Sequence, residues 1–300
     1  IVSDPLVIDL VNKKNINLEI HLSTQASTSN SESVKYWLSK GVKRVVLARE
    51  VGASSIKKII HETGADIEVF LHGAMCTCFS GRCVLSNYFT NRDSNRGGCA
   101  QVCRFVFDLD QKRDNKYSIA TKDLNLSYYI PDLIEMGVSS LKIEGRMRSS
   151  YYIATVISCY RKLIDAYYNN SFNEELLKKV SKILFRASNR ESSSQYFKGF
   201  ADQNDQYYGD RMEVSNQDFL GIVLGYDSKN KMLIIEQRNY FKKGDSAIIF
   251  TPFLEEYEIN FSKIYNNDLE ELDCARHPRE IIKIPFDKAL PKNSMMRVKL

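Results

Sequence analysis

Short apolar runs alternate with amphipathic segments through the first half of the chain. Runs rich in β-branched residues predict strands, and apolar residues that recur every three or four positions predict helices. The predicted strands are residues 1–3, 18–22, 44–49, 67–71, 118–120 and 141–143, and the predicted helices are residues 31–40, 54–62, 128–136 and 149–168. Strands that alternate with helices are typical of a parallel sheet covered by helices.

An open doubly wound sheet and a (β/α)8 barrel both have this alternation. No glycine-rich dinucleotide fingerprint follows any predicted strand, which argues against the open sheet. The count of about six strands is smaller than the eight of a complete barrel, and the chain opens abruptly, without Met, in a predicted strand. We therefore expect an α/β fold of the (β/α)8 TIM-type barrel class that lacks its first units in this chain.

The composition changes near residue 188. Residues 188–217 are polar and carry no helical stripe, which predicts a linker or crossing segment. Beyond it, short apolar runs separated by turn-forming clusters predict a small antiparallel β-barrel domain over residues 218–300. Its predicted strands are residues 220–224, 232–235, 247–250, 281–284 and 296–300. Residues 1–187 then form the barrel domain.

The composition is that of a soluble, cytoplasmic globular protein. Hydrophobic residues make up 43% of the chain and charged residues 26%, and no run approaches the roughly 18 apolar residues of a membrane-spanning helix. The first residues lack the basic start and cleavage site of a secretory signal. Seven cysteines, an odd number, outside a secretory context predict reduced thiols rather than a disulfide framework.

Four cysteines lie close together in a loop, residues 76–103, that follows the predicted strand 67–71. Their spacing is Cys76-x6-Cys83-x15-Cys99-x3-Cys103. Structural zinc usually takes its thiolates from two narrow pairs, and only the second pair here has that width. A four-iron four-sulfur cluster also takes four thiolates and has less regular spacing, whereas a catalytic cysteine needs one thiol and a base. The spacing favours a cluster over zinc and leaves both open.

The same loop is basic. It carries four arginines against a single acid, Asp93: Arg82, Arg92, Arg96 and Arg104. Positive charge of this kind suits an anionic cluster or a phosphate-bearing substrate, although a merely solvated loop has the same composition.

A (β/α)8 barrel places its chemistry at the carboxyl ends of its strands. The polar residues that we expect at these ends, as candidates for substrate binding, are His21, Gln25, Arg49, Glu50, His72, Lys122 and Arg148. The two histidines are each more often structural than functional, and Gln25 is equally suited to capping a helix.

The segment KIEGRMR, residues 142–148, is a stronger candidate. Its cations around a glycine at a strand exit suit an anion clamp, to which Lys142 and Arg146 contribute. Glu144 is the best general acid or base in it. We take Lys142, Glu144 and Arg146 as the candidate catalytic residues.

Several motifs resemble one known family. The segments EVFLHGAMC (68–76), SGRCVLS (80–86), GGCAQVCR (97–104) and KIEGR (142–146) occur in order, and EQRNYFKKGD (236–245) and DCARHP (273–278) follow in the second half. Together they are similar to the collagenase-like peptidase family U32. The resemblance extends over nearly the whole chain, with one departure at Gln195, where the family pattern tends to have glycine.

The resemblance implies a role in RNA chemistry rather than proteolysis. Bacterial members of the subgroup that this chain resembles are needed to hydroxylate the wobble uridine of tRNA to 5-hydroxyuridine, and depend on prephenate supply and iron–sulfur biogenesis. Other members of the family hydroxylate ribosomal RNA or act in oxygen-independent ubiquinone hydroxylation. The family's cluster ligands map onto Cys76, Cys83, Cys99 and Cys103, while Cys78 stands at a position that the motif leaves free.

We therefore expect an oxygen-independent RNA hydroxylase with a 4Fe-4S iron–sulfur cluster, which acts on tRNA and takes its oxygen from a small anionic, prephenate-linked donor. Four cysteine ligands leave no vacant iron, so the cluster is expected to transfer electrons or to be structural. The alternatives are a peptidase, for which no HExxH motif or recognisable Ser/His/Asp set is present, and a non-catalytic RNA-binding scaffold held together by Zn.

Overall fold

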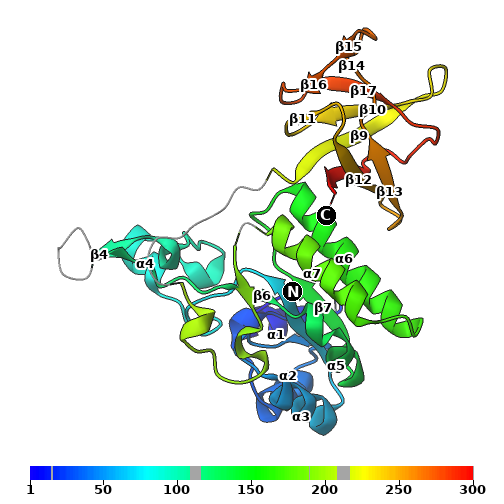
Figure 1. Ribbon diagram of the computed structural model, residues 1–300. Coiled ribbons are helices and arrows are strands. Elements are labelled where there is room, and N and C mark those ends of the chain that lie inside the picture. Colours follow the sequence, from blue (N-terminus) through cyan, green and yellow to red (C-terminus); the bar gives the residue numbers. More distant parts are fainter. Residues whose placement is uncertain (15, 109–115, 189, 208–216, 300) are drawn as a thin grey trace. The chain divides into compact units, whose positions relative to one another are not determined.

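The computed structural model (Figure 1) describes residues 1–14, 16–108, 116–188, 190–207 and 217–299. The chain divides into two compact units. The first contains residues 1–146 and 190–213, and the second contains residues 147–189 and 214–300. The segment 1–187, predicted as one barrel domain, is thus shared between the two units, and each is described by itself.

The first unit is built on a mixed sheet of six strands: β1 (His21–Leu22), β2 (Arg44–Val46), β3 (Asp66–Gly73), β6 (Asp123–Asn125), β7 (Ser140–Ile143) and β8 (Ser192–Ser193). The four strands β1, β2, β3 and β7 are parallel, with His21 opposite Arg44 and Arg44 opposite Asp66. Strand β6 runs antiparallel to the last two residues of β3, and β8 is parallel to β6. A short separate hairpin joins β4 (Phe107–Asp108) to β5 (Lys116–Tyr117).

The predicted alternation of strands and helices is confirmed, but a closed barrel is not. Within the described ranges the strand order is β1-β2-β3-β6-β8 with β7 beside β3, and no pairing joins the ends. The predicted strand at residues 118–120 is wrong, because this stretch forms no strand between β5 and β6, although the Ala120 carbonyl oxygen accepts from the Tyr207 amide at 2.8 Å.

The helices of the first unit are α1 (Pro5–Lys13), α2 (Ser31–Ser39), α3 (Ala53–Thr63), α4 (Leu85–Thr90) and α5 (Ile130–Glu135). Helix α1 was missed, since the opening residues were interpreted as a strand and only Val2 bridges to Leu22. The signal was present: the Asp4 carboxylate accepts from the Leu6 amide at 2.8 Å, and Pro5 occupies the first helical position.

Strand β3 separates an apolar face from a polar one, because successive side chains point to opposite sides. Ile67, Val69 and Leu71 are buried on one side. Glu68 and His72 lie on the other side and are also buried, so this face hides charged and polar groups that need partners.

The segment at residues 190–207, predicted as part of a linker or crossing segment, contains β8 and two short 3-10 helices, Gln195–Phe197 and Gln203–Asp205. Gln195 and Phe197 are buried in the first unit. The Gln195 amide group donates to the Lys122 carbonyl oxygen at 2.8 Å. Polar side chains such as Gln195, rather than an apolar helix face, attach this segment to the rest of the first unit. For this reason the sequence shows no helical stripe here.

The second unit combines two helices with an antiparallel sheet. The helices are α6 (Ser150–Tyr168) and α7 (Glu174–Ala187), and the sheet order is β13-β12-β18-β9-β10-β17-β14-β15. The strands are β9 (Phe219–Asp227), β10 (Met232–Gln237), β12 (Ser246–Phe250), β13 (Glu256–Asn260), β14 (Ile264–Tyr265), β15 (Glu271–Leu272), β17 (Ile281–Pro285) and β18 (Met295–Val298), with β11 (Phe241–Lys242) paired separately to β16 (Cys274–Ala275).

All five strands predicted for this half are present, as β9, β10, β12, β17 and β18. The sheet is curled around one apolar core in which Phe241 and Phe261 lie 4.4 Å apart between ring centroids. Its strand order does not return on itself among the described residues, so the predicted small barrel is confirmed only as a curled antiparallel sheet.

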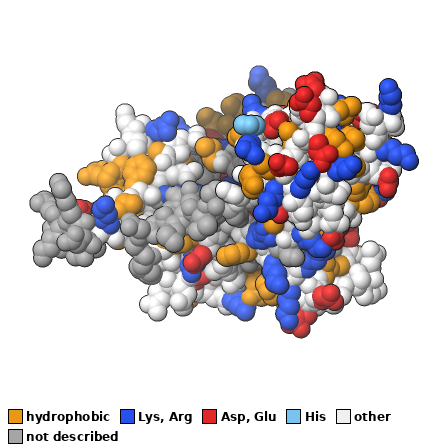
Figure 2. All heavy atoms as spheres, turned by 45° about the horizontal axis from the view of Figure 1, so that its top comes forward, with side chains coloured by type: hydrophobic (Ala, Val, Ile, Leu, Met, Phe, Trp, Pro, Cys, Tyr) orange, Lys and Arg blue, Asp and Glu red, His pale blue; other side chains and the backbone are white. Residues whose placement is uncertain are grey.

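Basic and acidic side chains are interspersed over much of the face shown in Figure 2, in keeping with a net charge of only +5. No helix in the described part of the chain combines the length and the apolar character needed to cross a bilayer.

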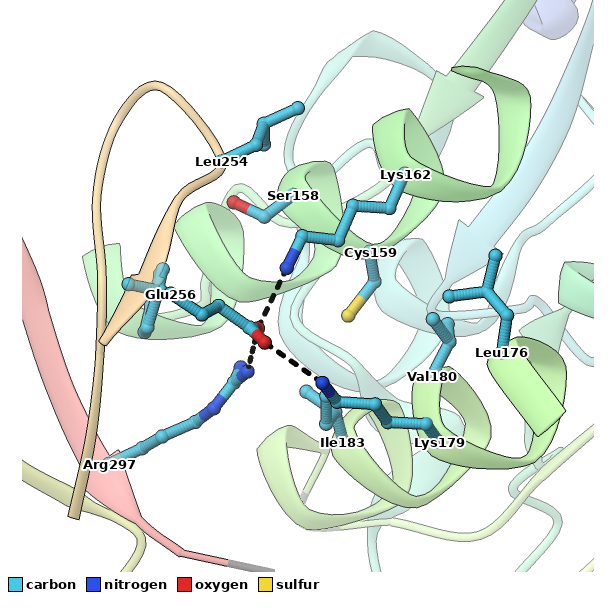
Figure 3. A pocket seen from close by; sticks show the side chains of 11 residues that line it. Ser158, Cys159, Lys162, Leu176, Lys179, Val180, Ile183, Leu254, Glu256 and Arg297 are labelled. Atoms are coloured by element: carbon cyan, nitrogen blue, oxygen red, sulfur yellow. Dashed lines mark hydrogen bonds and ion pairs between the residues drawn. The ribbon is translucent and has the colours of Figure 1, made fainter. Parts of the chain in front are cut away.

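An ion cluster attaches the two helices of the second unit to its sheet (Figure 3). The Glu256 carboxylate of β13 accepts from Lys162 of α6 at 2.7 Å, from Lys179 of α7 at 3.0 Å and from Arg297 of β18 at 2.6 Å. The cluster borders a cavity of about 60 Å³ beside the buried Cys159. Burial acts to raise the pKa of Glu256, but Lys162, Lys179 and Arg297 together lower it to about 2.

We predict that Glu256→Gln destabilises the protein by about 3 kcal/mol at pH 7, because three cations lose their shared carboxylate. The pKa of Glu256 is lowered from an ordinary 4.5 to about 2, so its contribution is complete above about pH 4.5 and is lost as the pH falls towards 2. In urea unfolding, the free energies of unfolding of the wild type and of the variant should therefore converge as the pH falls from 7 to 3. Glu258→Gln on the same strand removes an exposed pair with Lys299 and should cost less than about 1 kcal/mol. An equal loss of stability in the Glu256 and Glu258 variants would contradict the stabilising role assigned to the Glu256 ion cluster.

Candidate metal centre

The cysteine loop leaves the carboxyl end of β3 at a tight contact with β7. Gly73, the last residue of β3, has φ +110°, and a Cβ atom there would lie 2.1 Å from the Glu144 carbonyl oxygen. Only glycine fits this contact. The Glu144 amide in turn donates to the His72 carbonyl oxygen at 2.9 Å. The KIEGR segment and the start of the cysteine loop are therefore held side by side.

A second anchor holds the loop over the ends of β1 and β2. The Ser80 hydroxyl donates to the Glu50 carboxylate at 2.9 Å and accepts from the Arg49 amide at 3.0 Å. Gly81, at φ +72°, lies so close to Gln25 that a Cβ atom would come within 2.1 Å of the Gln25 carbonyl oxygen. Three predicted site residues, Gln25, Arg49 and Glu50, thus lie beside the loop.

Polar side chains connect the two halves of the loop. Asn95 accepts from the Cys83 amide at 3.3 Å and donates to the Cys83 carbonyl oxygen at 2.9 Å. The Ser86 hydroxyl accepts from the Ala100 amide at 3.0 Å. Cys83 is therefore brought towards the segment that carries Cys99 and Cys103.

The four predicted ligands act on one another electrostatically. Burial raises the pKa of Cys76, and Cys99 and Cys83 raise it further, while Arg49 and Arg104 oppose the shift. Burial likewise raises the pKa of Cys103 to about 11, with contributions from Cys76, Cys99 and Cys83. Mutual shifts of this kind require that the thiols lie near one another.

Cys78 also belongs to this group. Burial and a hydrogen bond to Cys83 raise the pKa of Cys78 to about 12. Burial acts to raise the pKa of Cys83 as well, but hydrogen bonds lower it below its ordinary value. The donors are the Ser94 hydroxyl, the amides of Leu85 and Ser86, and the Cys78 thiol. The residue that the family motif leaves free is therefore in contact with a predicted ligand.

The thiols are gathered without converging on one point. In the part of the chain that the structure describes, no three His, Cys, Asp or Glu side chains are arranged to hold a single metal ion. Zinc needs four donors at about 2.0–2.3 Å from one centre. A 4Fe-4S cluster instead takes each thiolate on a different iron, so its ligands lie farther apart. The donor set, four thiols and no carboxylate, suits either centre.

Arg104 belongs to the site, although sequence reasoning named it only as one of the basic residues of the loop. Its buried guanidinium lies 3.6 Å from the Asp123 carboxylate, which Arg190 also approaches to 3.6 Å. The structural roles of Ser80 and Asn95 were missed altogether. One signal was readable, because Asp93 accepts from the Asn95 amide in a short Asx turn that orients Asn95.

His21 was predicted at the carboxyl end of a strand, and this is wrong. It is the first residue of β1, opposite Arg44, at the edge of the sheet remote from the cysteine loop. Its ring is 2.7 Å from Glu19. The error arose because the strand begins at residue 21 instead of residue 18, so a residue expected near the end of the strand is its first residue.

The predicted anion clamp is only partly assembled. Lys142 binds the buried Glu68 carboxylate at 2.8 Å, and Arg44 approaches Glu68 to 3.9 Å. Arg146 is exposed, and its amide donates to the Glu144 carboxylate at 3.2 Å. Arg148 belongs to the second unit, where its guanidinium stacks on Tyr152 at 4.9 Å.

The remaining two predicted residues lie in the first unit. His72 is buried in β3 next to Gly73. Lys122 precedes β6, and its ammonium group pairs with Glu191 at 2.7 Å. His72 therefore adjoins the start of the cysteine loop, whereas Lys122 is used in an ion pair.

Comparison with known proteins agrees with these motifs. Residues 1–207 match the profile of peptidase family U32, and residues 215–297 match its C-terminal domain. The chain belongs to peptidase family U32. A family U32 relative in Bacillus subtilis, tRNA hydroxylation protein P1, is 44% identical over 308 residues, which cover 99% of this chain and 73% of that protein.

Other U32 relatives carry two different names. The tRNA hydroxylation protein P of Escherichia coli is 30% identical and the match covers 92% of this chain and 70% of that protein. A collagenase of Porphyromonas gingivalis is 36% identical over 61% of this chain and 49% of that protein. The solved C-terminal domain of a U32-family protein from Geobacillus thermoleovorans is 40% identical, covers 27% of this chain and 98% of that structure, and has a TM-score of 0.26.

We predict that Gly81→Ala destabilises the protein by more than about 3 kcal/mol, because the new methyl group meets backbone that cannot move aside. Gly97→Ala is the matched control. Gly97 also has a positive φ, +88°, but has no atom within 4 Å of the added Cβ, so it should cost only about 1 kcal/mol. Urea unfolding of both variants measures the difference. Equal losses would show that the contact with Gln25 does not hold the loop.

Proposed function

We propose that this protein takes part in tRNA hydroxylation, in which the wobble uridine becomes 5-hydroxyuridine. The observation that carries the proposal is the gathering of Cys76, Cys83, Cys99 and Cys103 at the carboxyl end of β3. It occurs in a chain that is 44% identical, over nearly its whole length, to a tRNA hydroxylation protein. The parallel strands β1, β2, β3 and β7 support a further proposal, that the first unit belongs to a (β/α)8 barrel.

In this proposal the four thiols hold a 4Fe-4S cluster, which supplies electron transfer when bound. Arg49 and Arg104 place positive charge beside Cys76 and offset the negative charge of the thiolates. Glu50 and Asn95 act by position: the first holds Ser80 and the second holds Cys83.

The substrate side of the site is assigned to the KIEGR segment. Glu144 is the candidate general acid or base, because its backbone is fixed against Gly73 at the start of the cysteine loop. The exposed Arg146 is suited to an anion, either RNA phosphate or a small anionic, prephenate-linked oxygen donor. Lys142 has a different role from the one expected, since it neutralises the buried Glu68 and thereby positions the segment.

A peptidase is the second candidate, because some relatives are named collagenases. A cysteine peptidase pairs its thiolate with a histidine base. The partners that the described residues provide for the loop thiols are other thiols, arginines, Ser94 and backbone amides. These partners suit a bound inorganic centre better than a nucleophile.

The proposal predicts that Cys→Ser variants at Cys76, Cys83, Cys99 and Cys103 lose iron and function together. Wild-type protein purified without oxygen should contain about four irons and four sulfides per chain and absorb broadly near about 400 nm. Each variant should retain less than about a quarter of the wild-type iron content. Nucleoside mass spectrometry should find no 5-hydroxyuridine in tRNA from a deletion strain, and wild-type protein should restore it where the four variants do not.

The control is Cys274→Ser, which alters a buried thiol in the second unit and should keep both iron and 5-hydroxyuridine. Unchanged 5-hydroxyuridine in the deletion strain would contradict the proposed function. Colourless protein with one zinc per chain would instead favour the zinc scaffold.

A further inference from the structure

The cysteine loop exposes an unusual number of large apolar side chains. Four aromatic rings lie on it or directly after it with much of their surface in water: Phe79 (66% exposed), Tyr88 (84%), Phe89 (51%) and Phe105 (46%). Val84 and Val106 are exposed among them. Hydrophobic side chains gather at the left of Figure 2, on the part of the first unit that carries α4 in Figure 1. Several large apolar side chains exposed on one segment are typical of an interaction site.

Two of these rings are held from behind. Phe89 packs on Phe107 of β4 with 5.7 Å between ring centroids, and Phe107 packs on Tyr117 of β5 at 5.9 Å. Tyr88 lies perpendicular to Phe89 with 5.0 Å between ring centroids, and 84% of Tyr88 stays exposed. The rings are therefore supported without being covered, so a partner that stacks on them loses little conformational entropy in ordering them.

The surface around the rings is positively charged. Arg82, Arg92 and Arg96 are exposed, and the only acid between residues 76 and 107 is Asp93. Asp93 lies 3.4 Å from Arg96, which leaves the charges of Arg82 and Arg92 without an ion pair within the described ranges. An apolar surface with this charge fits a polyanion that also carries flat apolar groups.

We propose that this surface, Phe79, Tyr88, Phe89 and Phe105 with Arg82 and Arg92, binds single-stranded RNA through base stacking on the rings and phosphate contacts to the arginines. The inference rests on the proposed function and names the substrate surface of that same loop. Unpaired bases stack on aromatic side chains, whereas paired bases in a duplex are shielded from them. The partner that fits is thus an RNA loop, not an RNA stem.

A second copy of this chain is the main competing occupant. A symmetric contact would place the arginines of one surface against the same arginines of the other, and like charges brought together oppose association. RNA instead supplies the opposite charge. The charge pattern therefore favours RNA.

The surface is also connected directly to the candidate metal centre. Tyr88 and Phe89 lie in α4, whose first amides, at Leu85 and Ser86, donate to the Cys83 sulfur. Phe105 follows Cys103 by two residues. Enzymes that modify a base must hold it outside a base pair. A loop stacked on these rings presents its unpaired bases beside the four thiols.

The test measures binding of a fluorescein-labelled anticodon stem-loop RNA to the full chain by anisotropy. Tyr88→Ala and Phe79→Ala should each raise Kd by about tenfold, since one stacked base is lost. Tyr88→Phe keeps the ring face and should bind within about twofold of wild type. Phe253→Ala, which removes a ring that is 75% exposed in the second unit, is the matched control and should leave Kd unchanged.

The arginines have a separate signature. Replacing both Arg82 and Arg92 by Ala should reduce the slope of log Kd against log salt concentration by about 1.4, because each phosphate contact to a single strand contributes about 0.7. A continuous RNA duplex of the same sequence, in which the loop bases are paired, should bind with a Kd that Tyr88→Ala does not change.

Binding by both alanine ring variants within twofold of wild type would overturn the proposal. So would a dimer that Tyr88→Ala converts to a monomer, in sedimentation, without any change in RNA affinity. These outcomes are independent of the proposed function, which fails if tRNA of the deletion strain keeps its 5-hydroxyuridine. Equal iron content in the ring variants and the wild type shows that the loop is intact.

Discussion

The position of the cysteine loop depends on the contact between Ser80 and Glu50. The Glu50 carboxylate accepts from the Ser80 hydroxyl and lies four residues after the end of β2, so it ties the long cysteine loop to the segment that leaves this strand. The close approach of Gly81 to Gln25 and of Gly73 to Glu144 leaves the loop no room to slide. The thiols, Arg49 and the KIEGR segment lie near one another because the loop is held in this position.

The loop then has two faces with different chemistry. On one of them the thiols lie near Arg49 and Arg104. Desolvation and the neighbouring thiols raise the pKa of Cys76, and the positive charge of the two arginines opposes this rise. Towards solvent, supported aromatic rings and unpaired arginine charge form the proposed RNA surface. One short segment can therefore hold an inorganic centre and present a substrate to it, because α4 links Cys83 to Tyr88 within six residues.

Sequence reasoning predicted the elements better than the contacts. Hydrophobic periodicity located α2, α3, α6 and the five main strands of the second unit, since a buried face needs a regular repeat. It placed His21 at the wrong edge, because sheet pairing with Arg44 decides where β1 begins. It gave Lys142 a catalytic role, because its partner Glu68 is distant in the chain. The four cysteine ligands stay a prediction, supported by the mutual influence of the thiols.

We propose that the four gathered thiols hold an iron–sulfur cluster, and the Mössbauer spectrum of protein produced with ⁵⁷Fe and purified without oxygen tests this directly. We expect the spectrum of a 4Fe-4S cluster, in which all of the protein-bound iron resides and which disappears in Cys76→Ser and Cys103→Ser. A protein free of iron, or one with only mononuclear iron that persists in these variants, would contradict it.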